Sequence, residues 1–401
     1  MQLRYNYRLD PTPGQRQALA RTFGCARVVF NDALRARQDA REAGLPYVSD
    51  GELSRRVTAA KETPERGWLG EVSSVVLQQA LADLNTAYRN FFASCSGTRK
   101  GRKVALPRFR SRKDNRQSIR FTRNARFAVT CGGKLRLPKI GDVALRWSRE
   151  LPSKPSSVTV TVDAAGRYHA SFVVQAPDRP LPATDAEVGI DLGLTSFAAL
   201  SDGAKVDNPR FARRAARKLA KAQRAFCRTK RGSKNRAKVR VKVARCHARV
   251  GATRRDWLHK ASTTIIRDNQ AVYVEDLCVL GLARTKLARS VYDAGWSTFV
   301  SMLEYKAARH GRTFGKIDRW FPSTRTCSQC AAISEAKPLS VRTWTCRCGA
   351  AHDRDTNAAR TILAAGRADR ANACGADVRP GPVPAVGVEA GTHRKPAPAK
   401  V

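Results

Sequence analysis

The fold expected for the second half of the chain is decided by Val188-Gly189-Ile190-Asp191-Leu192-Gly193, an apolar strand pattern that one carboxylate interrupts. Working outward, a second strand is expected at 196–201, followed by an Asp202-Gly203 turn and a third short strand. Long helices and a strand at 271–275 come next. A helix from about Ser290 to His310, a strand at 312–318 and a last helix from about Asp355 to Ala365 complete the pattern.

This order is three antiparallel strands, then helix, strand, helix, strand and helix, which is typical of an RNase H-like α/β fold. The segment from Pro177 to Thr184 carries three prolines and is interpreted as a linker that precedes it. The segment from Gly375 to Val401 is rich in Pro, Gly and Ala and has no period, so disorder is expected there.

The first half of the chain predicts helices and a small β domain. Residues 1–9 alternate like a strand, and Asp10-Pro11-Thr12-Pro13 ends that strand and starts a helix. Apolar residues then recur at helical spacing up to about Ser94. Short strands follow, with a hairpin turn from Asp163 to Gly166. A small barrel or sheet that includes the first strand is therefore expected.

The charge balance indicates the partner. The 401 residues include 75 Lys and Arg against 33 Asp and Glu, a formal net charge of +42. Nucleic acid is the expected counterpart, with an anionic membrane surface as the alternative. No apolar run is long enough for a transmembrane helix, and the start lacks the apolar core of a signal peptide. Eleven cysteines, scattered apart from one cluster, favour a reducing compartment, so an intracellular soluble protein is expected.

Two basic segments are candidates for binding that nucleic acid. Residues 99–126 interleave Lys and Arg with Phe, which can stack on bases, although a solvated loop with core aromatics is the alternative. Residues 210–255 carry 19 Lys and Arg and no Asp or Glu. Like charges destabilise a helix, so this segment is expected to face a polyanion. The residues expected to contact nucleic acid are Arg108, Arg110, Arg112, Lys113, Arg120, Arg213, Arg217 and Lys221.

Three carboxylates stand on or beside apolar elements of this basic chain: Asp191, Glu275 and Asp355. Two divalent ions that clamp a phosphodiester need hard oxygen ligands, which Asp and Glu supply. Each residue is weak evidence alone. An Asp at a helix start is often an N-cap, and Glu275 alone would be a surface charge at the end of a strand. Asp353 is the main alternative for the third position. Together the three predict a metal-dependent nuclease with two Mg²⁺ ions.

Four of the cysteines cluster as Cys327, Cys330, Cys346 and Cys348. Two thiolate pairs about fifteen residues apart predict a zinc ribbon with four cysteine ligands. The second pair is separated by a single residue, and His352 is an alternative ligand four residues further on. Four free cysteines are the remaining alternative.

Several motifs resemble those of the TnpB family, the transposon-encoded RNA-guided nucleases related to type V CRISPR effectors. The resemblance covers most of the chain and is highly specific. Two departures occur: Ala331 stands where the family usually has glycine, and the second cysteine pair usually has a two-residue gap. The motifs that carry the resemblance are residues 8–13, 23–27, 106–111, 189–193, 274–277, 286–290, 295–296, 305–306 and 353–359.

The resemblance implies a multidomain α+β fold, in which a helical recognition domain and a wedge β-barrel precede a RuvC-like nuclease domain. It assigns Asp191, Glu275 and Asp355 as the catalytic residues, and favours Asp355 over Asp353. The implied layout is 1–10 as the first barrel strand, 11–110 as the helical domain, 111–180 as the rest of the barrel, 185–370 as the nuclease domain with a zinc ribbon at 322–352, and 375–401 as a disordered tail.

The implied function is Mg²⁺-dependent, RNA-guided cleavage of double-stranded DNA next to a short transposon-adjacent motif. The implied partners are a guide RNA from the transposon end and the target DNA, with the protein acting as a monomer in the bacterial cytoplasm near the nucleoid. Two alternatives remain: a non-cleaving RNA-guided DNA-binding regulator on the same scaffold, and a DNA transposase that transfers strands with the same type of acidic triad. A nucleoid-type binder would explain the charge but neither the carboxylates nor the cysteines.

Overall fold

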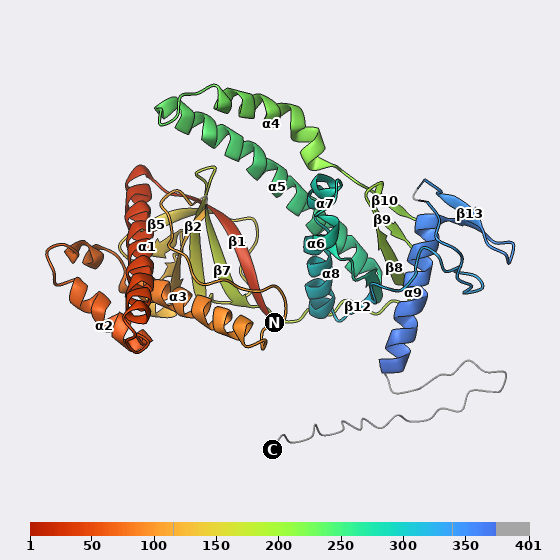
Figure 1. Ribbon diagram of the computed structural model, residues 1–401, viewed down its shortest axis with the longest axis horizontal. Coiled ribbons are helices and arrows are strands. Elements are labelled where there is room, and N and C mark those ends of the chain that lie inside the picture. Colours follow the sequence, from red (N-terminus) through yellow and green to blue (C-terminus); the bar gives the residue numbers. More distant parts are fainter. Residues whose placement is uncertain (115, 339, 374–401) are drawn as a thin grey trace, which may run out of the picture. The chain divides into compact units, whose positions relative to one another are not determined.

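A computed structural model describes residues 1–114, 116–338 and 340–373 (Figure 1). The chain divides into two compact units. The first comprises residues 1–177 and 224–245, and the second comprises residues 178–223 and the described residues from 246 onward. The disorder expected from Gly375 to Val401 falls outside the described residues.

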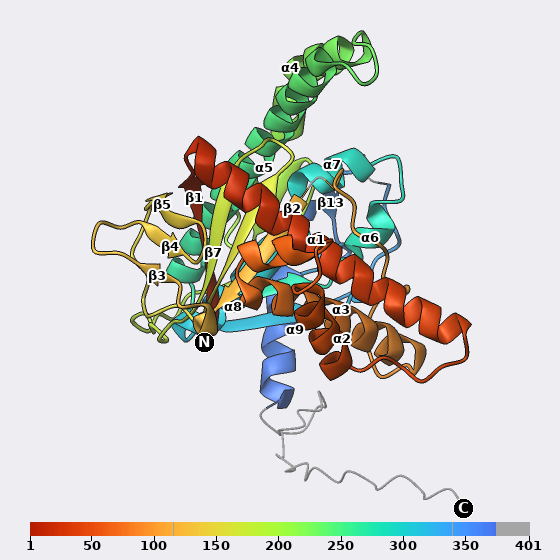
Figure 2. The same ribbon diagram turned by 90° about the vertical axis from the view of Figure 1, so that its left-hand side faces the viewer.

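The first unit is built on a seven-stranded sheet with the order β2-β6-β7-β1-β5-β4-β3. β1 pairs antiparallel with both β7 and β5, so the expected union of the first strand with the later ones is confirmed. Within the described part, the edge strands β2 and β3 do not pair, so the sheet is a curled half-barrel (Figure 2). Its strands are β1 (Gln2–Asp10), β2 (Arg116–Thr122), β3 (Ala128–Val129), β4 (Leu135–Leu137), β5 (Gly141–Arg146), β6 (Ser157–Asp163) and β7 (Tyr168–Gln175).

Three helices pack with this sheet, and α1 crosses in front of it in Figure 2. They are α1 (Pro13–Glu42), α2 (Asp50–Ala60) and α3 (Ser74–Cys95), with 3₁₀ turns η1 (Gly67–Glu71) and η2 (Arg123–Ala125). α1 starts where the sequence predicts, because Thr12 and Gln15 form a reciprocal capping box before Pro13. Phe30 of α1, Leu84 of α3 and the sheet residue Phe121 share one core.

The second unit contains a five-stranded sheet with the order β10-β9-β8-β11-β12. β9 is antiparallel to both β8 and β10, whereas β11 is parallel to both β8 and β12. Three antiparallel strands followed by two further strands with helices between them is the predicted element order, which is confirmed. The strands are β8 (Glu187–Leu192), β9 (Ser196–Leu200), β10 (Lys205–Asp207), β11 (Ala271–Glu275) and β12 (Thr313–Ile317).

One helix expectation is wrong. The helix predicted from about Ser290 to His310 is two helices, because Gly295 adopts a φ of 73° and ends α7 before α8 begins. The remaining elements are α4 (Phe211–Cys227), α5 (Lys234–Asp268), α6 (Val279–Leu282), α7 (Ala288–Ala294), α8 (Trp296–His310), α9 (Arg354–Ala373) and the small sheet of β13 (Thr343–Thr345) with β14 (Ala351–Asp353).

α9 packs directly on the sheet at Gly189 of β8. A Cβ added at Gly189 would lie 2.1 Å from the carbonyl oxygen of Ala359, so only glycine permits this approach. The glycine of the opening motif therefore sets the distance between the strand that carries Asp191 and the helix that carries Asp355. Across the described residues, none of the helices has the length and apolarity needed to span a bilayer.

Candidate functional site

The three predicted carboxylates come from three neighbouring elements. Asp191 lies in β8, and Glu275 is the last residue of the adjacent parallel strand β11. The register pairs Val274 with Ile190, so each carboxylate follows a paired residue by one position. Asp355 lies in the first turn of α9, the helix that packs against β8. The structure thus brings together residues that are up to 164 positions apart.

The electrostatics show that these carboxylates affect one another. Asp191 is partly exposed, yet the surrounding protein deprives its carboxylate of water, and Asp355 and Glu275 add like charge. Burial first, and then these two neighbours, raise the pKa of Asp191 to about 7, against the opposing effect of Arg354. Burial and the adjacent Asp276 also raise the pKa of Glu275. An acidic cluster whose members repel one another therefore stands inside a strongly cationic chain.

Asp353 has a different role from Asp355. Its Oδ1 accepts a hydrogen bond from the backbone N–H of Thr356 at 2.9 Å, which caps the start of α9. Its other oxygen accepts from Lys205 Nζ at 2.8 Å. Burial opposes ionisation of Asp353, but the hydrogen bonds from Lys205 and Thr356 outweigh it and lower its pKa. The N-cap interpretation therefore applies to Asp353, whereas Asp355 interacts with Asp191.

Arg342 is a residue of this site that the sequence interpretation missed. Its Nη1 lies 3.6 Å from Asp355 Oδ1, and its Nη2 donates to Thr195 Oγ1 at 3.2 Å. It precedes β13 in the cysteine-bearing segment, so this segment reaches the acidic cluster. In the sequence, nothing distinguishes Arg342 from the many other arginines of the chain.

The four predicted cysteines form a metal-sized cluster. Among the described residues, they are the one group of possible ligands whose donor atoms all lie within 4.8 Å of one another. Cys327 Sγ lies 3.8 Å from Cys348 Sγ, and Cys330 Sγ lies 3.7 Å from Cys346 Sγ. The one-residue gap of the second pair is therefore compatible with a four-cysteine site.

His352 lies beside the cysteine cluster as a hydrogen-bonding neighbour. Its Nε2 is 3.0 Å from Cys327 Sγ, and its ring packs against Trp344. Burial disfavours the thiolate of Cys327, but backbone N–H groups of Cys330 and Gln329, together with His352, lower the pKa of Cys327 to about 6. The four sulfurs can hold the metal without His352, which then orients one of them.

The departure at Ala331 has a structural consequence. Ala331 follows the first cysteine pair and adopts a φ of 59°, in the left-handed region that favours glycine. Its backbone N–H donates to the carbonyl of Cys327 at 2.9 Å, closing the turn that carries the first pair. Ala331 therefore adopts the backbone conformation that the usual glycine would adopt, and this conformation is strained for alanine.

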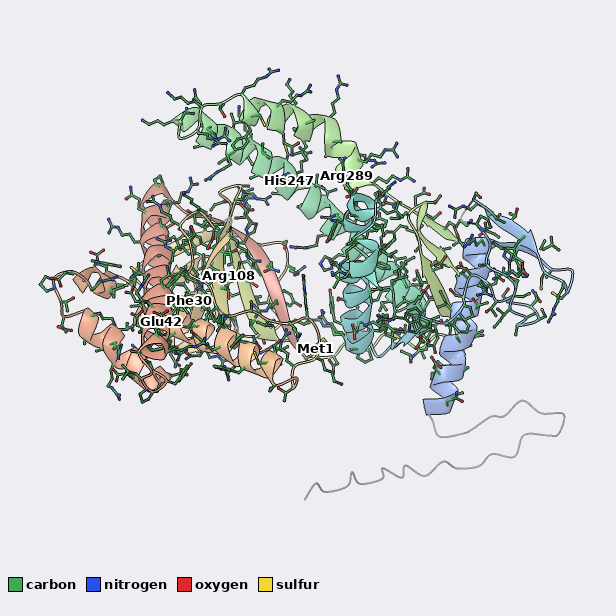
Figure 3. The ribbon with its side chains drawn as sticks, in the orientation of Figure 1. Met1, Phe30, Glu42, Arg108, His247 and Arg289 are labelled. Atoms are coloured by element: carbon green, nitrogen blue, oxygen red, sulfur yellow. The ribbon has the colours of Figure 1, made fainter. Side chains whose placement is uncertain are left out.

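Some cations of the basic segment 99–126 form ion pairs within the protein, and others do not. Arg110 and Arg120 both pair with Asp83, each at 3.1 Å, and Arg110 also stacks over Phe30. Phe121 is fully buried, so the core interpretation holds for that aromatic residue. Within this segment, the predicted contact residues that are exposed and make no ion pair in the described structure are Arg108, Arg112 and Lys113. Figure 3 labels Arg108.

The second basic segment forms α4 and most of α5. α4 buries no residue anywhere along its described length, and Arg213, Arg217 and Lys221 are all exposed. Figure 3 shows long side chains projecting from both helices, with His247 labelled on α5. A helix without buried residues gains little stability from apolar packing. Its exposed cations fit a surface that faces a polyanion.

Comparison with known proteins identifies the family. A relative from Streptomyces pristinaespiralis, named "Putative RNA-guided DNA endonuclease", is 48% identical over 380 residues, covering 94% of this chain and 92% of the relative. The chain belongs to the TnpB family. A second TnpB-family relative, from Escherichia coli strain K12 and named "Putative RNA-guided DNA endonuclease InsQ", is 30% identical and covers 94% of this chain and 95% of its own.

Three family descriptions match parts of this TnpB-family chain. They are "Probable transposase" at residues 171–286, "Cas12f1-like, TNB domain" at 296–362 and "Helix-turn-helix domain" at 1–45. The last description does not fit the local structure, because residues 1–45 form a strand and one 30-residue helix.

Solved structures share the fold at low sequence identity. A Cas12f1–sgRNA–target DNA complex matches with a TM-score of 0.53 at 13% identity, covering 87% of this chain and 82% of that one. The mini-RNA-guided endonuclease CRISPR-Cas_phi3 matches with a TM-score of 0.50 at 8% identity, covering 91% and 92%. This TnpB-family protein therefore has the mixed α+β architecture of those proteins.

Proposed function

We propose that this protein is an RNA-guided endonuclease that cuts double-stranded DNA next to a short transposon-adjacent motif. The observation that carries the proposal is the acidic cluster of Asp191, Glu275 and Asp355 inside a chain of net charge +42. A protein that only binds a polyanion gains nothing from clustered carboxylates, since they repel the phosphates. The names of the relatives support the same activity.

The residues of the cluster fit a pair of Mg²⁺ ions. The raised pKa of Asp191 reflects repulsion and lost hydration, and divalent cations offset both when carboxylate oxygens bind them. Bound Mg²⁺ supplies activation of water and stabilisation of charge on the transferring phosphoryl group. Asp191, Glu275 and Asp355 hold the metal, while Arg342 keeps a positive charge beside Asp355 and limits repulsion among the carboxylates.

The remaining parts of the chain have supporting roles in this proposal. Residues 185–370, which include β8 to β12, form the RuvC-like, RNase H-type nuclease domain, and Zn²⁺ on the four cysteines orders the ribbon at 322–352. Residues 11–110 form the recognition domain. It is inserted between the first strand of the wedge domain, residues 1–10, and the rest of that domain, residues 111–180. The unpaired cations among the residues predicted to contact nucleic acid bind the sugar-phosphate backbones of the guide RNA and of the heteroduplex.

Plasmid cleavage tests the proposal. The protein is co-expressed with RNA from the DNA that flanks its gene, and its targets carry a fixed guide match beside a randomised flank. Guide-dependent linear product is expected with Mg²⁺ and is lost with EDTA. The Asp191→Ala variant is expected to lose cleavage while it retains binding to RNA and DNA, whereas Asp207→Asn, an exposed carboxylate on β10, is the matched control.

Each other outcome contradicts the proposal in a defined way. Target binding without cleavage by the wild type would identify a non-cleaving regulator. Product in which a 3′ end is joined to target DNA would identify strand transfer by a transposase. Equal loss of RNA binding in Asp191→Ala would show that Asp191 has a structural role.

A further inference from the structure

A cavity of about 360 Å³ lies among α5, α6, α7 and α8, and its lining residues all belong to the second unit. Figure 1 labels these four helices. Its apolar lining includes Leu258 of α5, Leu280 of α6 and Tyr292 of α7. Leu280 is 65% exposed and Tyr292 is 62% exposed, so both present large apolar faces to solvent. The volume is that of a small-molecule site, and an aromatic face beside an aliphatic one suits a flat ring.

The same cavity has a hydrogen-bond donor without an acceptor. Trp296 lines the cavity and is only 3% exposed, and its indole Nε1 has no hydrogen-bond partner in the part of the chain that the structure describes. A buried N–H without an acceptor costs free energy, and a ligand in the cavity recovers that cost when the indole turns its N–H toward it. Trp296 therefore distinguishes this cavity from an ordinary apolar hollow.

The charged groups around the cavity favour an anion. Ser297 and Thr298 of the lining lie in the first turn of α8. The N–H of Thr298 donates to the carbonyl of Gly295 at 3.0 Å, and Gly295 has no side chain that could accept from the N–H of Ser297. Arg254 is tied to the backbone of Tyr292 and to Asp293. Arg255 is exposed and has no partner among the described residues. The residues that line the cavity include no carboxylate.

We propose that this cavity binds one unpaired nucleotide of the RNA or the DNA. Its base lies against Tyr292 and Leu280, and its phosphate lies toward Arg255 and the N-terminus of α8. The inference rests on the proposed nucleic-acid function and adds a contact to a single base. A free nucleoside triphosphate fits less well, because the chain has no Gly-rich phosphate loop and the lining has no carboxylate to hold its metal.

Photo-crosslinking locates the nucleotide. The full-length protein is irradiated with poly(U) RNA carrying one 5-iodouridine, or with poly(dT) DNA carrying one 5-iododeoxyuridine, and crosslinked peptides are identified by mass spectrometry. Crosslinks are expected within residues 279–298. The oligonucleotide that gives the stronger crosslink identifies whether RNA or DNA is the source.

Three variants and a control make the test specific. A Cβ at Gly251, which lines the cavity from α5, meets no atom within 4 Å, so Gly251→Leu has room for its Cβ at the cavity wall and favours the helix. Trp296→Phe removes the indole N–H, and Arg255→Gln removes the free charge. Arg179→Gln makes the same charge change at an exposed position outside the cavity and outside both basic segments.

Gly251→Leu and Arg255→Gln are expected to reduce crosslinking about fivefold or more, as lost stacking or charge contacts would, whereas Arg179→Gln leaves it unchanged. Trp296→Phe is expected to reduce it less. Crosslinks outside the cavity, or crosslinks that Gly251→Leu leaves unchanged, would overturn the proposal. Cleavage of plasmid in the same preparations separates the two proposals: an active nuclease without cavity crosslinks refutes the cavity alone, and cavity crosslinks without cleavage refute the nuclease alone.

Discussion

Replacement of Asp191 by Asn is expected to stabilise the metal-free protein at alkaline pH. Asp191 has a pKa of about 7 in the folded protein, against an ordinary value of 3.8. The folded state therefore binds its proton more tightly than the unfolded state does, and the free energy of unfolding falls as pH rises from about 4 to about 7. At about 1.4 kcal/mol per pKa unit, the full loss is about 4 kcal/mol. Asn carries no charge and avoids this loss.

The assay is urea unfolding of the RNA-free protein in EDTA at pH 5 and at pH 8. From the two pKa values, the advantage of Asp191→Asn is about 2 kcal/mol at pH 5 and about 4 kcal/mol at pH 8. Added Mg²⁺ should raise the stability of the wild type and not that of the variant, since only the wild type binds the ion. Asp207→Asn serves as the control: its stability should match that of the wild type at both pH values, and Mg²⁺ should raise it as in the wild type. An Asp191→Asn variant less stable than the wild type at pH 8 would refute the reasoning, because Asp191 would then be a satisfied structural carboxylate.

Three further predictions address other parts of the chain. Ala331→Gly should raise the stability of the zinc-loaded ribbon by about 1 kcal/mol, because it relieves a left-handed alanine, and zinc retention against a chelator measures this. Lys306→Met should destabilise the protein by roughly 1–3 kcal/mol in urea unfolding, because Lys306 Nζ donates to Ser262 Oγ at 2.7 Å and to two other acceptors, which lose their donor. Replacing three cations of α4 with Gln should lower the salt slope of nucleic-acid binding by about 2–3, and an unchanged slope would show that α4 does not contact phosphates. These three cations are Arg213, Arg217 and Lys221.

Elements with strong local signals were predictable from the sequence. The strands around Asp191 and Glu275 follow from apolar runs bounded by turn residues, and α1 follows from Thr12 and Pro13 at its start. The break between α7 and α8 was missed, because a single glycine inside an apolar helical pattern can either continue the helix or end it. Only the packing around Gly295 selects the positive φ that ends the helix.

The sequence could not separate residues whose roles depend on distant partners. Asp353 and Asp355 are two positions apart, and only the contacts with Lys205 and Thr356 identify Asp353 as the cap. Arg110 and Arg120 look like free cations in the sequence, yet Asp83 pairs with both.

By itself, the sequence determined the chemistry of the protein: its cationic surface, its carboxylates on apolar elements, and its paired cysteines. These are properties of residue type and local spacing, which do not depend on the path of the chain. Only the tertiary structure decided which of these groups act on one another. Asp191, Glu275 and Asp355 come together through the pairing of β8 with β11 and the close packing of α9 on Gly189. Coulomb interactions and desolvation depend on distances through space, and folding alone sets those distances.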